Sequence, residues 1–305
     1  MKILVTGGHG FLGKHLVAVL GKDNPLLVPS SKELDVEKYE VLFEYLTATR
    51  PDAIIHLAAV CGGIGANQNS PADFFIRNNI MGANILKASH DCGVSKLVTL
   101  GSVCSYPKLT PTPFKEEDIW NGYPEATNAP YGIAKKNLLV GCEAFSEQYG
   151  SNFIHLIPVN MYGEYDHFDL QSSHVIPALI RKFHEAKTNK TDKVVVWGDG
   201  QASREFLYAG DCAEAIHMAL HNYNDPAPVN IGTGVEITIK DLVIKIKQIV
   251  GFKGEIVYDT SKPNGQPRRC LDTTRARESF GFEAHTPLAD GLLKTYDWYL
   301  HNVAN

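Results

Sequence analysis

A short glycine-rich turn near the start of the chain limits the possible folds more than any other feature. Thr6 to Gly13 read TGGHGFLG, directly after the β-rich run Lys2–Val5 and at the start of the helix-like segment Phe11–Leu20. Glycine tolerates positive φ, lets the backbone approach a pyrophosphate and lets the helix pack closely on the strand. The helix start offers free N–H groups to phosphate, so this turn predicts a dinucleotide site. The expected cofactor contacts here are Gly7, Gly8, His9, Gly10, Phe11, Leu12 and Gly13.

Strand-like apolar runs alternate with helix-like segments through the first half of the chain. The expected strands are Lys2–Val5, Leu26–Pro29, Ala53–Leu57, Lys96–Leu100 and Phe153–Pro158. The expected helices are Phe11–Leu20, Glu37–Thr49, Pro71–Cys92 and Tyr131–Tyr149. The strands are apolar throughout, as expected when both faces of a sheet are covered. This order predicts an α/β fold with a doubly wound parallel sheet of the Rossmann type.

The second half mixes short strands, loops and helices, which predicts a second, smaller α/β lobe that binds substrate. Its expected elements are Val175–Ala186, Lys193–Trp197, Glu205–Tyr208, Ala213–Asn222, Val229–Ile231, Ile239–Val250, Glu255–Tyr258 and Leu288–His301. We expect the dinucleotide-binding domain to span residues 1–163 plus about 205–228, and the lobe to span 164–204 and 229–305. The proline-rich stretch Tyr106–Pro130 is expected to be a long functional loop.

Composition narrows the choice of partners. A net charge of −5 over 305 residues implies no strongly basic face, so we expect no nucleic-acid partner. No apolar run approaches the ~20 residues that span a bilayer, and the opening residues do not resemble a signal peptide. The six cysteines form no CxxC pair, so no metal site is predicted. Scattered cysteines favour reduced thiols and a cytoplasmic protein.

The segment after the second expected strand indicates which nicotinamide cofactor is bound. An acidic residue there would bond the ribose 2′-hydroxyl of NAD, but this chain has Ser30, Ser31 and Lys32. Hydroxyls and an ammonium suit a 2′-phosphate, so we expect NADP(H), contacted by Ser31 and Lys32. The alternative is that Lys32 is a solvated surface lysine.

Tyr131 and Lys135 are four residues apart and share one face of a helix. A nearby ammonium is expected to lower the pKa of a phenol, which then exchanges protons near neutral pH. Ser102 follows the fourth expected strand, where the loops at the carboxyl edge of the sheet meet a cofactor. We therefore expect Ser102, Tyr131 and Lys135 to act together on a carbonyl group. The alternative for the Tyr–Lys pair is an unrelated surface pair.

These motifs together resemble the extended short-chain dehydrogenase/reductases that act on nucleotide sugars. The resemblance rests on TGGHGFLG, HLAA at 56–59, GSVC at 101–104 and YGIAK at 131–135. Longer segments, among them VCGGIGANQNSPADF, ATNAPYGIAKK, SHVIPALIRKFHEA and SREFLYAGD, resemble the GDP-L-fucose synthase family along almost the whole chain. The resemblance implies an NADPH-dependent 3,5-epimerase/4-reductase of GDP-4-keto-6-deoxy-D-mannose.

The resemblance also assigns roles in catalysis. It implies that Cys104 is the base of the epimerisation and that His174 is its acid partner on the opposite face of the sugar ring. Both roles fit the chemistry, because a 4-keto group acidifies the C3 and C5 protons, and thiols and imidazoles titrate near neutrality. The alternatives are a buried core thiol and a surface histidine. Further implied cofactor contacts are Leu57, Ala58, Ala59, Tyr131, Lys135, Pro158, Asn160, Met161 and His174.

Four further residues are implied to bind the GDP-sugar. Arg204 matches a diphosphate-contacting arginine, and Trp197 matches a nucleotide-contacting tryptophan. Lys182 replaces a second arginine of the family pattern, and Asn264 replaces its usual aspartate. The alternatives are a core tryptophan at 197 and a plain surface turn at 264.

Other functions stay open at this point. The changes at Lys182 and Asn264 also suit a related epimerase/reductase of another GDP-keto-sugar, such as a heptose, or an epimerase without net reduction. A 4,6-dehydratase is disfavoured, because Val103 and Cys104 stand where those relatives carry an acidic pair. A non-catalytic NADP-binding sensor would not need the catalytic set. Because the two long helices often pair across a two-fold axis in this superfamily, we expect a homodimer.

Overall fold

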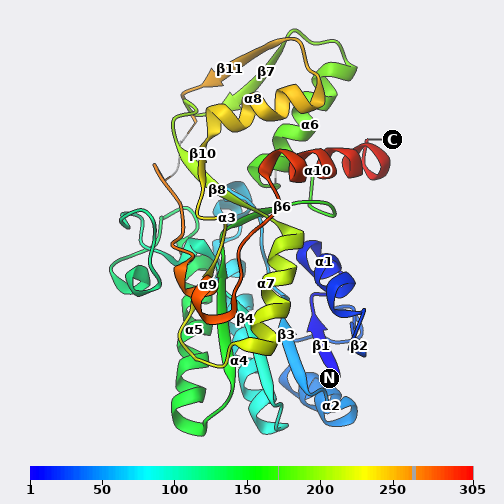
Figure 1. Ribbon diagram of the computed structural model, residues 1–305, viewed down its shortest axis with the longest axis vertical. Coiled ribbons are helices and arrows are strands. Elements are labelled where there is room, and N and C mark those ends of the chain that lie inside the picture. The colour runs from blue at the N-terminus through cyan, green and yellow to red at the C-terminus, as the bar shows by residue number, and fades with distance from the viewer. Residues whose placement is uncertain (171, 263–265, 305) are drawn as a thin grey trace.

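Six parallel strands form the main sheet of the computed structural model, which describes residues 1–170, 172–262 and 266–304 (Figure 1). The strand order is β2-β1-β3-β4-β5-β9. Their bounds are Ile3–Thr6 (β1), Leu26–Leu27 (β2), Ala53–His56 (β3), Lys96–Leu100 (β4), Phe153–Pro158 (β5) and Val229–Ile231 (β9). Every residue of β1, β3, β4 and β5 is buried, as their continuous apolar sequences predicted. The predicted fold class is therefore confirmed.

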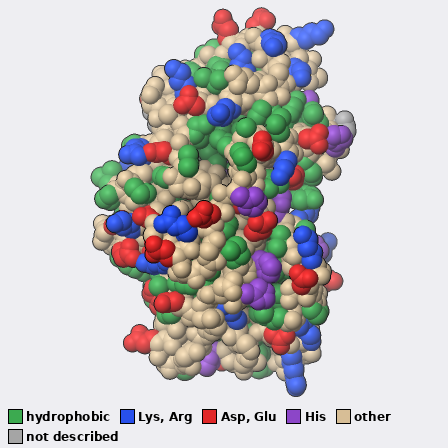
Figure 2. Space-filling view, viewed as in Figure 1, with side chains coloured by type: hydrophobic (Ala, Val, Ile, Leu, Met, Phe, Trp, Pro, Cys, Tyr) green, Lys and Arg blue, Asp and Glu red, His purple; other side chains and the backbone are tan. Residues whose placement is uncertain are grey.

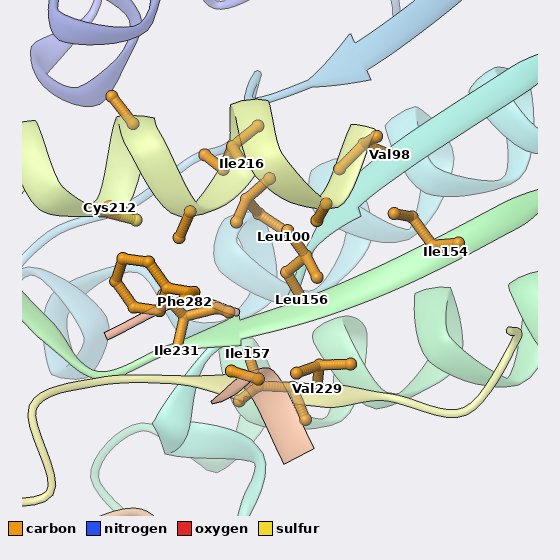
Figure 3. Close-up of a cluster of buried hydrophobic side chains, with 14 of the residues drawn as sticks. Val98, Leu100, Ile154, Leu156, Ile157, Cys212, Ile216, Val229, Ile231 and Phe282 are labelled. Carbon is orange, nitrogen blue, oxygen red and sulfur yellow. The ribbon is translucent and has the colours of Figure 1, made fainter. Parts of the chain in front are cut away.

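Helices cover both faces of this sheet, and neighbouring side chains such as Ile3 and Leu4, or Leu97 and Val98, face opposite cores. One core contains Ile3, Val98, Leu100 and Leu156, and two helices cover it, α1 (Phe11–Leu20) and α7 (Ala209–Asn222). Figure 3 shows part of this core beneath α7. The other core contains Leu4, Ile54, Leu97 and Phe153 under three helices, α2 (Tyr39–Thr49), α4 (Pro71–Asp91) and α5 (Ala129–Tyr149). This alternation is the two-residue period of a strand acting on two apolar faces.

A second set of elements gathers at one end of the molecule (Figure 1). Three strands pair in the order β10-β8-β6, and β11 pairs with β7 in parallel. Their bounds are Asn160–Tyr162 (β6), Lys193–Trp197 (β7), Ser203–Tyr208 (β8), Glu236–Thr238 (β10) and Glu255–Asp259 (β11). Helices α6 (Val175–Thr188), α8 (Ile239–Val250) and α10 (Leu288–Asn302) enclose a separate core there. The strongly amphipathic sequence of α8 explains its place over this core.

Some short elements have no clear sequence signal. These are β6, β10, the helices α3 (Ile64–Asn69) and α9 (Thr274–Phe280), and two 3-10 turns, Val103–Ser105 and Glu116–Trp120. Each is too short for hydrophobic periodicity to emerge. β9 was assigned to the smaller lobe but pairs with β5 in the large sheet. The full division of the chain into two domains stays a prediction.

On the face drawn in Figure 2, acidic and basic side chains are interspersed, and neither kind covers a large area alone. Across the described ranges, no helix combines the length and the apolar character that crossing a membrane requires.

Two histidines are buried inside the main sheet. The His56 Nδ1 atom lies 2.8 Å from Thr6 Oγ1, and the His155 Nδ1 atom lies 2.8 Å from Thr99 Oγ1. Burial and, to a lesser extent, the nearby Lys135 ammonium lower the pKa of each imidazole to about 3. Both rings are therefore neutral in the folded protein at neutral pH.

These rings should make the protein acid-sensitive. The unfolded chain binds a proton at each histidine below about pH 6.5, whereas the folded protein does not until about pH 3. Stability therefore falls as the pH drops through this window, by about 2 kcal/mol per ring at about pH 5. In His155→Asn, the loss of unfolding free energy between pH 7 and about pH 5 should shrink by that amount in denaturant titrations. His301→Asn, an exposed control, should show the same loss as the unaltered protein. An unchanged loss in His155→Asn would contradict this account.

Candidate active site

The glycine turn packs backbone against backbone. Gly7 has a φ of 72°, and its carbonyl accepts a hydrogen bond from the Gly10 N–H at 2.9 Å. A Cβ atom at Gly13 would lie 2.3 Å from the Gly7 oxygen, and one at Gly7 would lie 2.7 Å from the Ala58 nitrogen. No side chain caps the start of α1 at Gly10. The turn, the start of α1 and the loop after β3 thus meet at one edge of the sheet, which fits a dinucleotide pyrophosphate.

The residues expected to choose the cofactor lie beside this turn. The His9 ring nitrogen Nε2 lies 3.0 Å from the Val28 carbonyl oxygen. The backbone N–H and the hydroxyl of Ser30 both donate to Glu33 at 2.7 Å, which lowers the pKa of that carboxyl. Ser31 and Lys32 are exposed. An exposed hydroxyl and an ammonium at this position fit the 2′-phosphate of NADP(H).

The structure brings Ser102, Tyr131 and Lys135 together. Ser102 follows β4, and its hydroxyl accepts a hydrogen bond from the Cys104 N–H at 3.2 Å. The Tyr131 hydroxyl shares hydrogen bonds with Ser102 and Cys61. Lys135 lies one turn further along α5, where its ammonium donates to the Leu100 carbonyl at 2.9 Å. The carboxyl edge of the sheet and the first turns of α5 therefore form one polar cluster.

Gly132 explains how α5 reaches this position. A Cβ atom there would lie 2.3 Å from the Cys104 carbonyl oxygen. The neighbouring Ser105 hydroxyl donates to the Gly132 carbonyl at 3.0 Å. The glycine after Tyr131 thus lets the helix contact the turn that carries Cys104.

Burial controls the charges in this cluster. Desolvation lowers the pKa of Lys135 to about 8. Burial raises the pKa of Tyr131 well above its usual value, and ionised Cys61 and Cys104 would raise it further. The expectation that Lys135 lowers the pKa of this phenol is wrong for this structure, because desolvation of the phenol outweighs its neighbours. Tyr131 is therefore a proton donor rather than a base here.

The Cys104 sulfur lies among hydrogen-bond donors. Asn128 Nδ2 donates to it at 3.3 Å, and Arg269 Nη1 approaches it at 3.7 Å. Burial, followed by repulsion from Arg269, lowers the pKa of Arg204 to about 10, while Cys104 opposes that shift. One amide and one guanidinium group thus contact the thiol expected to act as a base, and the Arg204 guanidinium interacts with it electrostatically.

His174 lies at the start of α6 and is exposed. The loop before it is tied to the loop after β3, because the Gly63 N–H donates to the Ser172 carbonyl at 2.9 Å. His174 also interacts electrostatically with Asp166, whose pKa burial raises to about 6 while His174 opposes the rise. Asp166 in turn acts on Cys61, the partner of Tyr131. These links place His174 on the side of the cluster that faces the loop after β3.

The predicted substrate residues lie farther out. The Trp197 ring is 59% exposed, so the core alternative for this tryptophan is wrong. Ammonium groups of Lys182 and Lys262 lie 5.7 and 5.4 Å from its centre. Arg204 differs from these two residues, because it interacts electrostatically with the Cys104 thiol. Asn264 lies outside the described residues.

The segment expected to contact the nicotinamide lies at the end of β5 and just after it. Most of its side chains pack or bond within the protein. Pro158 is buried, Met161 packs against the main core, and the Asn160 amide donates to the Glu205 carbonyl at 3.1 Å. Cofactor contacts at this segment would therefore come mainly from its backbone.

Sequence reasoning did not single out Cys61, Asn128, Asp166 or Arg269. Cys61 follows HLAA closely, and Asn128 stands one helical turn before Tyr131, so position along the motifs held a signal for both. Arg269 reaches the site only through the fold, from a segment that runs beside β8.

The close packing at Gly13 allows a direct test of where the cofactor binds. In Gly13→Ala, the methyl group meets the Gly7 oxygen and Gly8 backbone at 2.3–2.6 Å, so the turn must open. NADPH binding measured by fluorescence titration should weaken about tenfold or more. Gly82→Ala is the matched control, because its nearest neighbour is a Leu138 methyl at 3.4 Å, an ordinary contact. Equal affinities in the two variants would contradict the placement of the cofactor.

Comparisons with known proteins agree with this geometry. The model of the NAD dependent epimerase/dehydratase family matches residues 3–232. The GDP-L-fucose synthase of Sinorhizobium fredii is 43% identical over 305 residues, which cover 100% of this chain and 97% of that relative.

Two solved structures show the same fold along the whole chain. A GDP-L-fucose synthetase from Naegleria fowleri bound to NADP has a TM-score of 0.92 at 29% identity, covering 100% of this chain and 95% of that chain. A GDP-6-OMe-4-keto-L-xylo-heptose reductase from C. jejuni has a TM-score of 0.93 at 30% identity, covering 98% and 97%.

Proposed function

The chain belongs to the NAD dependent epimerase/dehydratase family, and we propose that it converts GDP-4-keto-6-deoxy-D-mannose to GDP-L-fucose with NADPH. The reaction inverts C3 and C5 of the sugar and then reduces its C4 ketone. The observation that carries this proposal is the thiol of Cys104 beside the Ser102–Tyr131 pair. A simple ketone reductase needs no base at that position, whereas an epimerase does.

In the epimerisation, Cys104 removes a proton from the carbon next to the ketone. The C–H bond breaks, an S–H bond forms, and the electron pair moves to the ketone oxygen. Tyr131 and Ser102 donate hydrogen bonds to that oxygen, which stabilises the enolate. His174 then returns a proton to the opposite face of the ring.

In the reduction, the same phenol completes the chemistry at C4. NADPH, when bound, supplies the hydride. Tyr131 protonates the C4 oxygen, and the raised pKa of its phenol keeps the proton available until the oxygen becomes basic. The buried ammonium of Lys135 compensates the charge left on the phenol. The glycine turn and the exposed Ser31 and Lys32 would hold the cofactor.

The GDP part of the substrate fits the basic and aromatic groups of the smaller lobe. Arg204 has the planar donor geometry that suits a diphosphate. The exposed ring of Trp197, with ammonium groups nearby, suits a nucleotide base. Lys182 keeps the charge of the family's arginine but loses its bidentate geometry.

One alternative substrate is favoured by a specific observation. The heptose reductase from C. jejuni covers nearly the whole chain at a TM-score of 0.93. Incubation with NADPH and either GDP-4-keto-6-deoxy-D-mannose or a GDP-keto-heptose, followed by NMR of the product, separates the two. GDP-L-fucose as the product supports the proposal, and no NADPH oxidation with the 6-deoxy sugar rejects it.

Two variants test the division of labour. Cys104→Ala should reduce deuterium uptake from solvent into the ketosugar, measured without NADPH, about 10²-fold or more, because the base is lost. Tyr131→Phe should reduce NADPH oxidation by a similar factor, because the proton donor is lost. Cys92→Ala is the matched control, since that thiol contacts the Phe43 carbonyl far from the cluster. Unchanged deuterium uptake in Cys104→Ala would remove the thiol from the mechanism.

The protein is also proposed to form a homodimer through α4 and α5. These helices border an open groove of about 670 Å³, and Val140 and Tyr149 on α5 are 45% and 51% exposed. Exposed apolar side chains along two long helices suit pairing with a second copy.

Light scattering tests the dimer. Val140→Glu places a charge in the groove and should give a monomer, because a buried unpaired carboxylate is costly. Val257→Glu, at a valine 38% exposed on β11, should leave the dimer intact. A monomeric unaltered protein would contradict the proposal.

A cytoplasmic location is proposed as well. All six cysteines are free of disulfide bonds, including the exposed Cys61. Free thiols persist in a reducing compartment.

A further inference from the structure

Arg269 is a buried cation whose partners are unusual. Its side chain is 8% exposed, and among the described residues it takes part in no salt bridge with a carboxylate. Its guanidinium donates to the Gln266 amide oxygen from Nε at 3.2 Å and from Nη2 at 3.0 Å. Its remaining nitrogen, Nη1, approaches Cys104 Sγ at 3.7 Å. A buried guanidinium is costly without an anion, so the sulfur is its candidate counter-charge.

The guanidinium is held in place from both ends. Gln266 is itself buried, and its amide donates to the Lys108 carbonyl at 2.8 Å. The backbone carbonyl of Arg269 accepts from the Glu205 N–H at 3.0 Å, which fixes its segment beside β8. Its direction toward the thiol is therefore set by the fold.

The carboxylate of Glu205 is hydrogen-bonded to backbone N–H groups rather than to Arg269. Glu205 is fully buried, and its oxygens accept from the N–H groups of Leu271 at 2.7 Å, of Gly234 at 2.8 Å and of Thr233. Its neighbour Arg204 is a second cation near the same sulfur. Among the described residues, Arg269, Arg204 and Tyr131 are charged or titratable groups that interact with Cys104.

We propose that Arg269 is a positioning residue that, with Asn128 as a second donor, stabilises the thiolate of Cys104 and aims it at the sugar. This inference rests on the proposed role of Cys104 as the base. A thiolate is the reactive form of cysteine, and a neighbouring guanidinium favours it. When Cys104 takes the proton, the thiolate becomes a neutral thiol and its electron pair ends in the enolate, so the negative charge moves toward Tyr131 and Ser102. Arg269 therefore stabilises the ground state needed for the proton abstraction.

The test uses the full-length protein without any sugar. Cys104 is alkylated with iodoacetamide near pH 7, and the rate is followed by mass spectrometry of its peptide. Arg269→Gln should slow this alkylation about tenfold, because a charged hydrogen bond to the thiolate is lost. Arg269→Lys should restore most of the rate, because it keeps the positive charge.

Cys61 is the internal control in the same experiment. The residue is exposed, although burial raises the pKa of its thiol, and the groups that act on this thiol are Tyr131, Lys135 and Asp166 rather than Arg269. Its alkylation should be equal in all three proteins, and NADPH affinity should be unchanged, which shows that each variant is folded.

An equal Cys104 rate in Arg269→Gln and the unaltered protein would overturn the inference. If the variant then also has a raised KM for the GDP-sugar, Arg269 is a substrate-binding residue instead. Because alkylation is measured without substrate, a failure of the proposed sugar specificity leaves this test intact.

Discussion

Direct contact between backbones at a few glycines holds this site together. The helix α1 meets the first turn at Gly13, and α5 meets the turn that carries Cys104 at Gly132. At both places a single methyl group would overlap a carbonyl oxygen. The starts of these two helices therefore both pack against loops at the same edge of the sheet. Without these contacts the thiol, the phenol and the cofactor turn would stand apart.

Desolvated positive charge is the second feature of the site. The sheet buries Lys135 close to two neutral imidazoles, and the neighbouring segment buries Arg269 against a thiol. Because the charged groups of Lys135 and Arg269 are poorly solvated, they act strongly on the groups around them. In the proposed reaction, these cations would lie near a thiolate and near a ketone oxygen that gains negative charge, and burial favours the protonated form of Tyr131.

The sequence predicts the main sheet and the long helices well, because their signals are local. The apolar runs at β1, β3, β4 and β5 and the periodicity of α8 need no tertiary information. The Ser102, Tyr131 and Lys135 cluster was also predictable, because strand ends and helix faces fix its geometry.

Other parts depend on contacts between distant segments. The partner of Val229–Ile231 is decided by packing against β5, which no local pattern encodes. The same holds for Arg269, which reaches Cys104 across 165 positions of sequence. Burial also raises the pKa of the Tyr131 phenol where a lowered pKa is expected from the sequence, because desolvation depends on the surrounding atoms and not on spacing along a helix.

The path of the chain limits how the smaller lobe can move. The chain passes between it and the main sheet at five places: β5 to β6, β8 to α7, β9 to β10, β11 to α9, and α9 to α10. A body attached through five connections moves only where several of them bend together. Any opening of the lobe must therefore bend several of these connections at once, and the lobe is not one continuous segment that could be cut away.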